Sequence, residues 1–114
     1  MKTLLLAAAV ATLLTSQARA DDPELSIESK RMLAYGTLAV MTGACKTNLA
    51  PGQAAQIKSG LAKASEAQQD LTEADFTEIM KAAGTQVGQN KAQVCASLTP
   101  DFIATSLEEA AAGR

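Results

Sequence analysis

The chain has no histidine and no tryptophan, and its aromatic side chains amount to one tyrosine and two phenylalanines. Without histidine it lacks the commonest general base, the usual zinc ligand and the base of the common catalytic triads. It also has no glycine-rich phosphate loop and no G-x-S-x-G or S-x-x-K spacing. We therefore predict no catalytic residue, no cofactor and no metal site. A small carboxylate-dependent enzyme is the least favoured alternative.

A basic cluster is lacking as well. All 12 acidic residues follow Ala20, whereas two of the 10 basic residues, Lys2 and Arg19, precede it, so the chain beyond Ala20 carries a net charge of −4. Such an acidic domain has little attraction for the phosphates of nucleic acids or for anionic lipids. We expect neither as a partner.

The first twenty residues have the order of a secretory signal peptide. Lys2 precedes an apolar run at residues 4–14, and Ser16-Gln17-Ala18-Arg19-Ala20 forms a small-x-small cleavage site. The run is much shorter than the ~20 residues that span a bilayer, so a retained membrane anchor is the weaker interpretation. We expect cleavage after Ala20, export to the periplasm or the medium, and a single helical domain at residues 21–114.

Only two cysteines occur, Cys45 and Cys95. In an exported chain, two cysteines are most simply explained by one disulfide. Closing this loop would stabilise the fold by about 4 kcal/mol on the loop-length model, a large share of the stability of a small domain. Intermolecular or reactive thiols are the alternative, although a redox pair usually has its cysteines two residues apart.

Apolar residues at helical spacing predict four helices, at about 23–45, 51–69, 72–95 and from 99 onward. Each predicted helix opens on a start signal. These signals are Asp22-Pro23, Pro51, the pair Thr72 and Asp75 in a capping-box arrangement, and Thr99-Pro100. Nothing in the sequence indicates a strand.

The predicted fold is all-α, a small four-helix bundle (three to five helices) with one disulfide. Both cysteines would lie near the carboxyl ends of the first and third helices, so these helices should run parallel and the second antiparallel to them. Gly84 and Gly88 share one side of the third helix. Since each glycine costs a helix about 1 kcal/mol, we expect another helix to pack closely there.

A cluster of four carboxylates surrounds the start of the third predicted helix, namely Asp70, Glu73, Asp75 and Glu78. Their spacing does not match a calcium-binding loop. Acidic residues are favoured at a helix amino terminus, and this explains the cluster without a metal ion.

The most apolar segment is residues 32–45, which carries no charge. The simpler interpretation is a central helix that buries the few large side chains. The alternative is that Met32, Leu33 and Tyr35 form a surface for a protein partner or a homodimer.

Three functions are compatible with these features. The favoured one is non-covalent protein binding outside the cytoplasm, as an inhibitor, immunity factor or accessory subunit. The architecture around Cys45 and Cys95 also resembles the acid-stress chaperones of the HdeA family, which are small exported helical proteins whose single disulfide closes a comparably long loop. The resemblance covers architecture alone, and it implies a stress-response chaperone that exposes apolar surface in acid. Without histidine, such a switch would act below about pH 5. The third is the carboxylate-dependent enzyme.

Overall fold

The computed structural model describes residues 25–113. The predicted signal peptide, its cleavage at Ala20, and the start signal at Asp22 and Pro23 lie outside these residues. The described part of the chain forms five helices and no strand. Their bounds are Ile27–Ala44 (α2), Pro51–Ala67 (α3), Glu73–Gln89 (α4), Lys91–Ser97 (α5) and Pro100–Ala112 (α6). The prediction of an all-α fold is confirmed.

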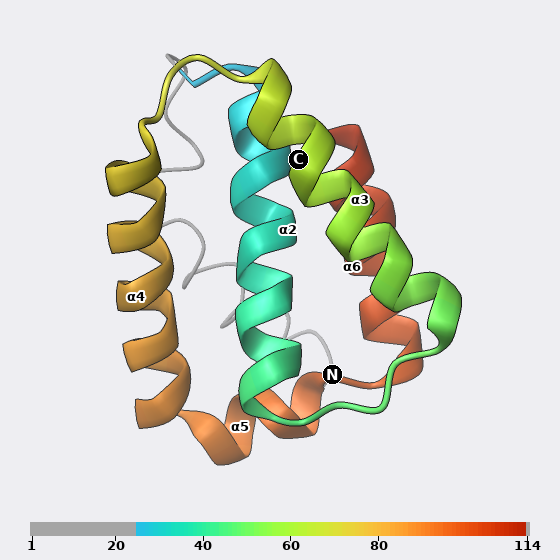
Figure 1. The fold of residues 1–114 in the computed structure, drawn as a ribbon. Helices are drawn as coiled ribbons and strands as arrows, with labels where there is room; N and C mark the ends of the chain where they lie inside the picture. Colours follow the sequence, from blue (N-terminus) through green and yellow to red (C-terminus); the bar gives the residue numbers. More distant parts are fainter. Residues whose placement is uncertain (1–24, 114) are drawn as a thin grey trace.

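Helix α2 is the centre of the molecule. It packs against α3 and α6 on one side and against α4 on the other, and the short helix α5 crosses below its carboxyl end (Figure 1). Helices α2 and α4 run in the same direction and α3 runs against them (Figure 1). The predicted orientation of the three helices is therefore correct, but α4 packs mainly on α2 and stands apart from α3.

The start of α2 differs from the prediction. The N-cap residue is Ser26, whose Oγ accepts a hydrogen bond from the Ser29 N–H at 3.1 Å. The Ser26 N–H is itself occupied, because it donates to Asp70 Oδ2 at 2.7 Å. Because the Ser26 hydroxyl and N–H are both hydrogen-bonded, Ser26 keeps the extended backbone of an N-cap. Helix α2 therefore begins at Ile27, four residues after the expected start at residue 23.

The third predicted helix is divided in two. Helix α4 ends at Gln89, and Asn90 leaves the helical conformation with φ −122° and ψ 30°. The Gln86 carbonyl accepts from the Asn90 side chain at 3.0 Å and from the Asn90 N–H at 3.1 Å, so Asn90 is bonded twice to the last turn of α4. The chain then turns into α5, which contains Cys95 and lies below the carboxyl end of α2 (Figure 1).

The other helix starts agree with the prediction. Pro51 and Pro100 each take the first helical position. Thr72 accepts from the Asp75 N–H, and the Asp75 carboxylate accepts from the Thr72 N–H, both at 3.1 Å, which completes the capping box of α4. Thr99 caps α6 by accepting from the Phe102 N–H at 3.2 Å.

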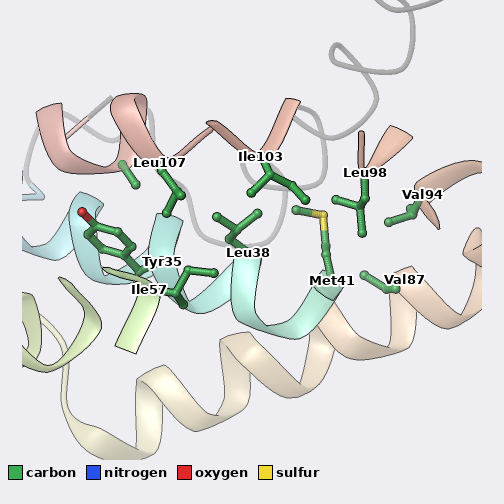
Figure 2. Packing of buried hydrophobic residues seen from close by; sticks show 10 residues of the cluster. Tyr35, Leu38, Met41, Ile57, Val87, Val94, Leu98, Ile103 and Leu107 are labelled. Carbon is green, nitrogen blue, oxygen red and sulfur yellow. The ribbon is translucent and has the colours of Figure 1, made fainter. Parts of the chain in front are cut away.

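The hydrophobic core surrounds α2. Figure 2 shows side chains from all five helices converging on Leu38 and Met41. The buried members of the cluster are Tyr35, Leu38, Met41, Ile57, Val87, Val94, Leu98, Ile103, Leu107 and Ala110. None of the helices between Ile27 and Ala112 combines the length with the apolar character that crossing a bilayer requires.

Close helix contacts do occur at glycines, but not at the pair expected. A Cβ added at Gly88 would meet nothing within 4 Å, and one at Gly84 would only touch Val40 at 3.9 Å. The prediction of close packing along this side of α4 is therefore wrong. Tight contacts lie instead at Gly60, which faces the Tyr35 ring, at Gly36, which faces Phe76 and Met80, and at Gly113, which faces Ile27.

Candidate functional site

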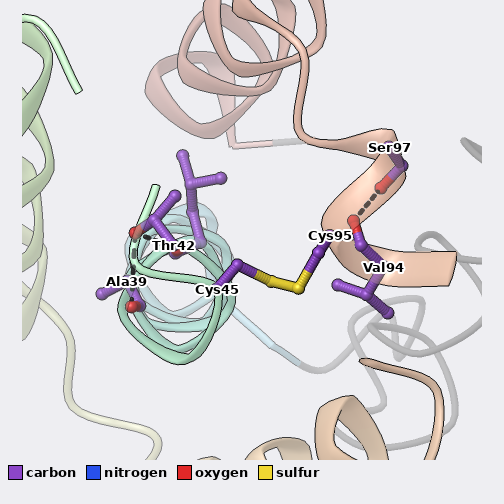
Figure 3. The surroundings of a disulfide bond; sticks show 7 residues. Ala39, Thr42, Cys45, Val94, Cys95 and Ser97 are labelled. Atoms are coloured by element: carbon purple, nitrogen blue, oxygen red, sulfur yellow. Dashed lines mark hydrogen bonds between the residues drawn. A yellow bond between two sulfur atoms is a disulfide. The ribbon is translucent and has the colours of Figure 1, made fainter. Parts of the chain in front are cut away.

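The two cysteines form the predicted disulfide. Their sulfur atoms are 2.01 Å apart and their Cα atoms 5.5 Å apart, and the bond joins the C-cap of α2 to the middle of α5 (Figure 3). Nearby hydroxyls are committed to the backbone, because Thr42 donates to the Leu38 carbonyl at 2.9 Å and Ser97 to the Val94 carbonyl at 2.6 Å. Both thiols of the chain are consumed, so neither is a nucleophile or a metal ligand in this state.

Met32, Leu33 and Tyr35 lie in the interior. Their exposed fractions are 2%, 0% and 5%, respectively. The structure therefore supports the interpretation of this segment as a core helix. In this conformation the three side chains offer no surface to a partner.

The acidic cluster does not act as a unit. Among residues 25–113 there is no group of three or more carboxylate or cysteine side chains arranged to hold a metal ion. Asp75 belongs to the capping box, while Glu73 lies in the first turn of α4, where a negative charge is favoured. Asp70 faces a different element altogether.

Asp70 fastens the loop between α3 and α4 to the start of α2. Its Oδ2 accepts from the Ser26 N–H at 2.7 Å and from the Ser29 hydroxyl at 2.8 Å. These bonds hold the pKa of Asp70 below its usual value of 3.8, the Ser26 N–H contributing most, because they stabilise the charged carboxylate. Sequence reasoning missed this contact, since a polar pair separated by 44 residues leaves no periodic signal.

A groove lies between the second half of α2 and the first half of α3. The two helices are close near the end of α3 and diverge toward the loop at residues 45–50 (Figure 1), and the space between them has a volume of about 510 Å³. Its apolar lining includes Leu49, Ile57 and Leu61, and Lys46 and Lys58 provide its cations. The other lining residues are Ala39, Thr42, Gly43, Thr47 and Ala54.

The groove lies in a part of the chain that has no acidic residue. Residues 29–65 contain no Asp or Glu, but they carry the five cations Lys30, Arg31, Lys46, Lys58 and Lys63. Of these, Arg31 forms an ion pair with Glu28 at 2.5 Å, whereas neither lysine of the groove has an ion pair within the described residues. Net charge conceals this segregation, which is why the composition alone indicated no basic region.

Lys46 has an unusual backbone. Its φ of 50° is the one positive value of a residue other than glycine between residues 25 and 113. Glycine and asparagine adopt this left-handed conformation more readily than lysine does. The position directly follows α2, where a cation also interacts favourably with the helix dipole.

No protein-family model, no curated protein and no solved structure matches this chain.

Proposed function

We propose that this protein is exported through its signal peptide and acts outside the cytoplasm by binding a protein partner non-covalently, as an inhibitor, immunity factor or accessory subunit does. The observation that carries the proposal is the groove between α2 and α3. It combines a largely apolar lining with two lysines that have no ion pair within the described residues. An apolar centre with a polar rim is the usual composition of a protein-binding surface.

The chemistry of the lining favours binding over catalysis. Its polar side chains are those of Lys46, Lys58, Thr42 and Thr47, and the Thr42 hydroxyl already donates to the backbone. Carboxylate, imidazole and thiol groups do not line the groove. An acid–base pair of the kind that most hydrolases use is therefore not formed by these residues.

The shape of the groove favours a macromolecular partner. Sites for small ligands enclose most of the ligand surface, whereas this groove is shallow and opens to solvent between two diverging helices. A protein segment can lie along such a groove and remain exposed on its outer side.

Export is supported by two features. The amino-terminal twenty residues follow the signal-peptide pattern, and disulfides persist mainly in oxidising compartments outside the cytoplasm. Mass spectrometry of the protein recovered from the periplasm or the medium should give the mass of a chain that begins at Asp21. This mass should be lower by two hydrogens than that of the same chain with both cysteines reduced. A product retaining residues 1–20 would contradict the proposed export.

A matched pair of variants tests binding. Ala54 lines the groove and Ala55 does not, yet both are exposed residues near the start of α3. Immobilised wild-type protein, Ala54→Glu and Ala55→Glu should each be exposed to periplasmic extract and the retained proteins compared. We expect a protein retained by the wild type and by Ala55→Glu and lost with Ala54→Glu. Equal retention by both variants, or by none of the three proteins, would rule out binding through this groove.

A further inference from the structure

We infer that the segment of the partner that enters the α2–α3 groove is an amphipathic helix whose apolar stripe is flanked by acidic residues. This inference rests on the proposed function, because it assumes that the groove binds a protein, and it adds the conformation and the charge of the bound segment. The conformation follows from the backbone of the groove walls and the charge from its lysines.

The walls of the groove favour a helical segment. Both walls are helices, whose backbone N–H and C=O groups are bonded within the helix. A peptide that binds by adding a strand needs an exposed sheet edge, and no strand occurs at residues 25–113. A helix brings its backbone hydrogen bonds with it, and therefore it can lie between α2 and α3 without leaving buried polar groups unpaired.

The lining of the groove fits an apolar stripe. Leu49, Ile57 and Leu61 come from the loop and from α3, while Ala39 lies opposite them on α2. Leu49, Leu61 and Ala39 are partly exposed at present, and covering them removes apolar surface from water. A bound helix reaches such a row of contacts with apolar residues spaced three and four positions apart.

The positive charge of the α2–α3 groove favours a bound helix that carries acidic residues. Lys46 lies in the loop that closes one end of the groove and Lys58 lies on the α3 wall. Residues 29–65 contain no carboxylate that could neutralise these lysines locally. A partner with lysine or arginine beside its apolar stripe would meet like charge, whereas glutamate or aspartate would be attracted.

Synthetic peptides of about 18 residues, long enough to form a helix when bound, test this inference on the exported, disulfide-bonded protein. The first peptide has a leucine stripe flanked by glutamates, the second replaces these glutamates by lysines, and the third has the composition of the first in a scrambled order. NMR titration of the ¹⁵N-labelled protein measures each affinity and maps the site. We expect the first peptide to shift amide signals around Ala39, Ala54 and Leu61, to bind more weakly as salt is added, and to bind at least tenfold more tightly than the other two.

Charge variants give the matched control. Lys46→Gln with Lys58→Gln removes the two cations of the groove. The loss of each lysine should lower the affinity for the glutamate peptide roughly two- to fivefold, as the loss of a partly screened ion pair does. Lys81→Gln with Lys91→Gln removes the same charge from exposed positions of α4 and α5 and should leave the affinity unchanged. An equal effect of the two double variants would overturn the role assigned to the groove lysines.

Other outcomes separate this inference from the proposed function. The inference is wrong if the lysine peptide or the scrambled peptide binds as well as the glutamate peptide. It is also wrong if decanoate, a fatty-acid anion used as a small amphipathic ligand, shifts the groove signals while no peptide does. In that case, selective capture of a partner by Ala55→Glu over Ala54→Glu still supports protein binding. If that comparison also fails, the proposed function is wrong as well.

Discussion

Replacing Gly60 by alanine tests a close contact between α2 and α3. A Cβ at position 60 would lie 2.5 Å from Tyr35 Cε2 and 2.7 Å from Cε1. The ring cannot easily move away, because Tyr35 is buried within the core cluster. The steric cost should lie near the upper end for overpacking, about 3 kcal/mol.

A gain in helix propensity opposes this cost. Alanine is better than glycine by about 1 kcal/mol in the interior of a helix, so Gly60→Ala should lower the free energy of unfolding by about 2 kcal/mol. Gly84→Ala supplies the control, because its added methyl group would only touch Val40 at 3.9 Å. This variant should be more stable than the wild type by about 1 kcal/mol.

Thermal unfolding followed by circular dichroism measures both effects. For a domain of this size, 1 kcal/mol corresponds to a change in Tm of about 4–8 °C. Gly60→Ala should therefore melt roughly 8–16 °C below the wild type and Gly84→Ala about 4–8 °C above it. If Gly60→Ala were as stable as Gly84→Ala, Tyr35 would not be held against α3 and the described packing of the two helices would be wrong.

Three further changes test the contacts that fasten the helices. Reducing the Cys45–Cys95 bond removes a cross-link across 50 residues and should lower the free energy of unfolding by about 4 kcal/mol; identical urea midpoints with and without reductant would contradict this. Thr72→Ala removes the N-cap of α4 and should cost about 1 kcal/mol in urea unfolding, whereas Thr77→Ala, at an exposed position of the same helix, should cost nothing. The Asp70 carboxylate has its pKa lowered from 3.8 by hydrogen bonds in the folded protein. The stability it contributes is therefore complete above pH 3.8 and is lost as the pH falls through the lower folded-state pKa. Asp70→Asn should have a lower urea midpoint than the wild type at pH 7 and a smaller deficit near pH 2, and a deficit of equal size at both pH values would contradict the role given to this carboxylate.

Helix starts could be predicted from the sequence wherever one local signal stands alone. The pair Thr72 and Asp75, and the sequence Thr99-Pro100, carry their hydrogen-bond partners within three residues, and both signals have the predicted role. The start of α2 could not be located in this way, because Asp22 and Ser26 both offer a cap within five residues. The choice of Ser26 depends on a bond to Asp70, which is distant in the sequence.

The end of α4 was missed for a related reason. The apolar spacing continues from Val87 to Val94 as if a single helix passed through Asn90. Both valines are indeed buried, but they reach the core from two helices with a turn between them. Periodicity records which residues are buried, and it does not record a change in the direction of the helix axis.

The disulfide and the core helix followed from cysteine number and apolar content, whereas the groove did not. It arises because α2 and α3 are close where Tyr35 meets Gly60 and separate toward the loop. The angle between two helices depends on packing that no local pattern contains. The charge of the groove region could have been read from the sequence, since residues 29–65 contain five cations and no carboxylate.

The attachments at the two ends of α4 affect how this helix can open. Only Ala83 and Val87 of its 17 residues are fully buried, although Phe76 and Met80 also contact Gly36 of α2. One end is held by Asp70 on Ser26 and the other by α5 through the disulfide. We expect the amide hydrogens of α4 to exchange with deuterium ahead of those of α2, through brief local openings while the remaining helices stay folded. Because the Asp70–Ser26 hydrogen bond and the disulfide hold the two ends of α4 during such an opening, the helix returns to the same position on α2.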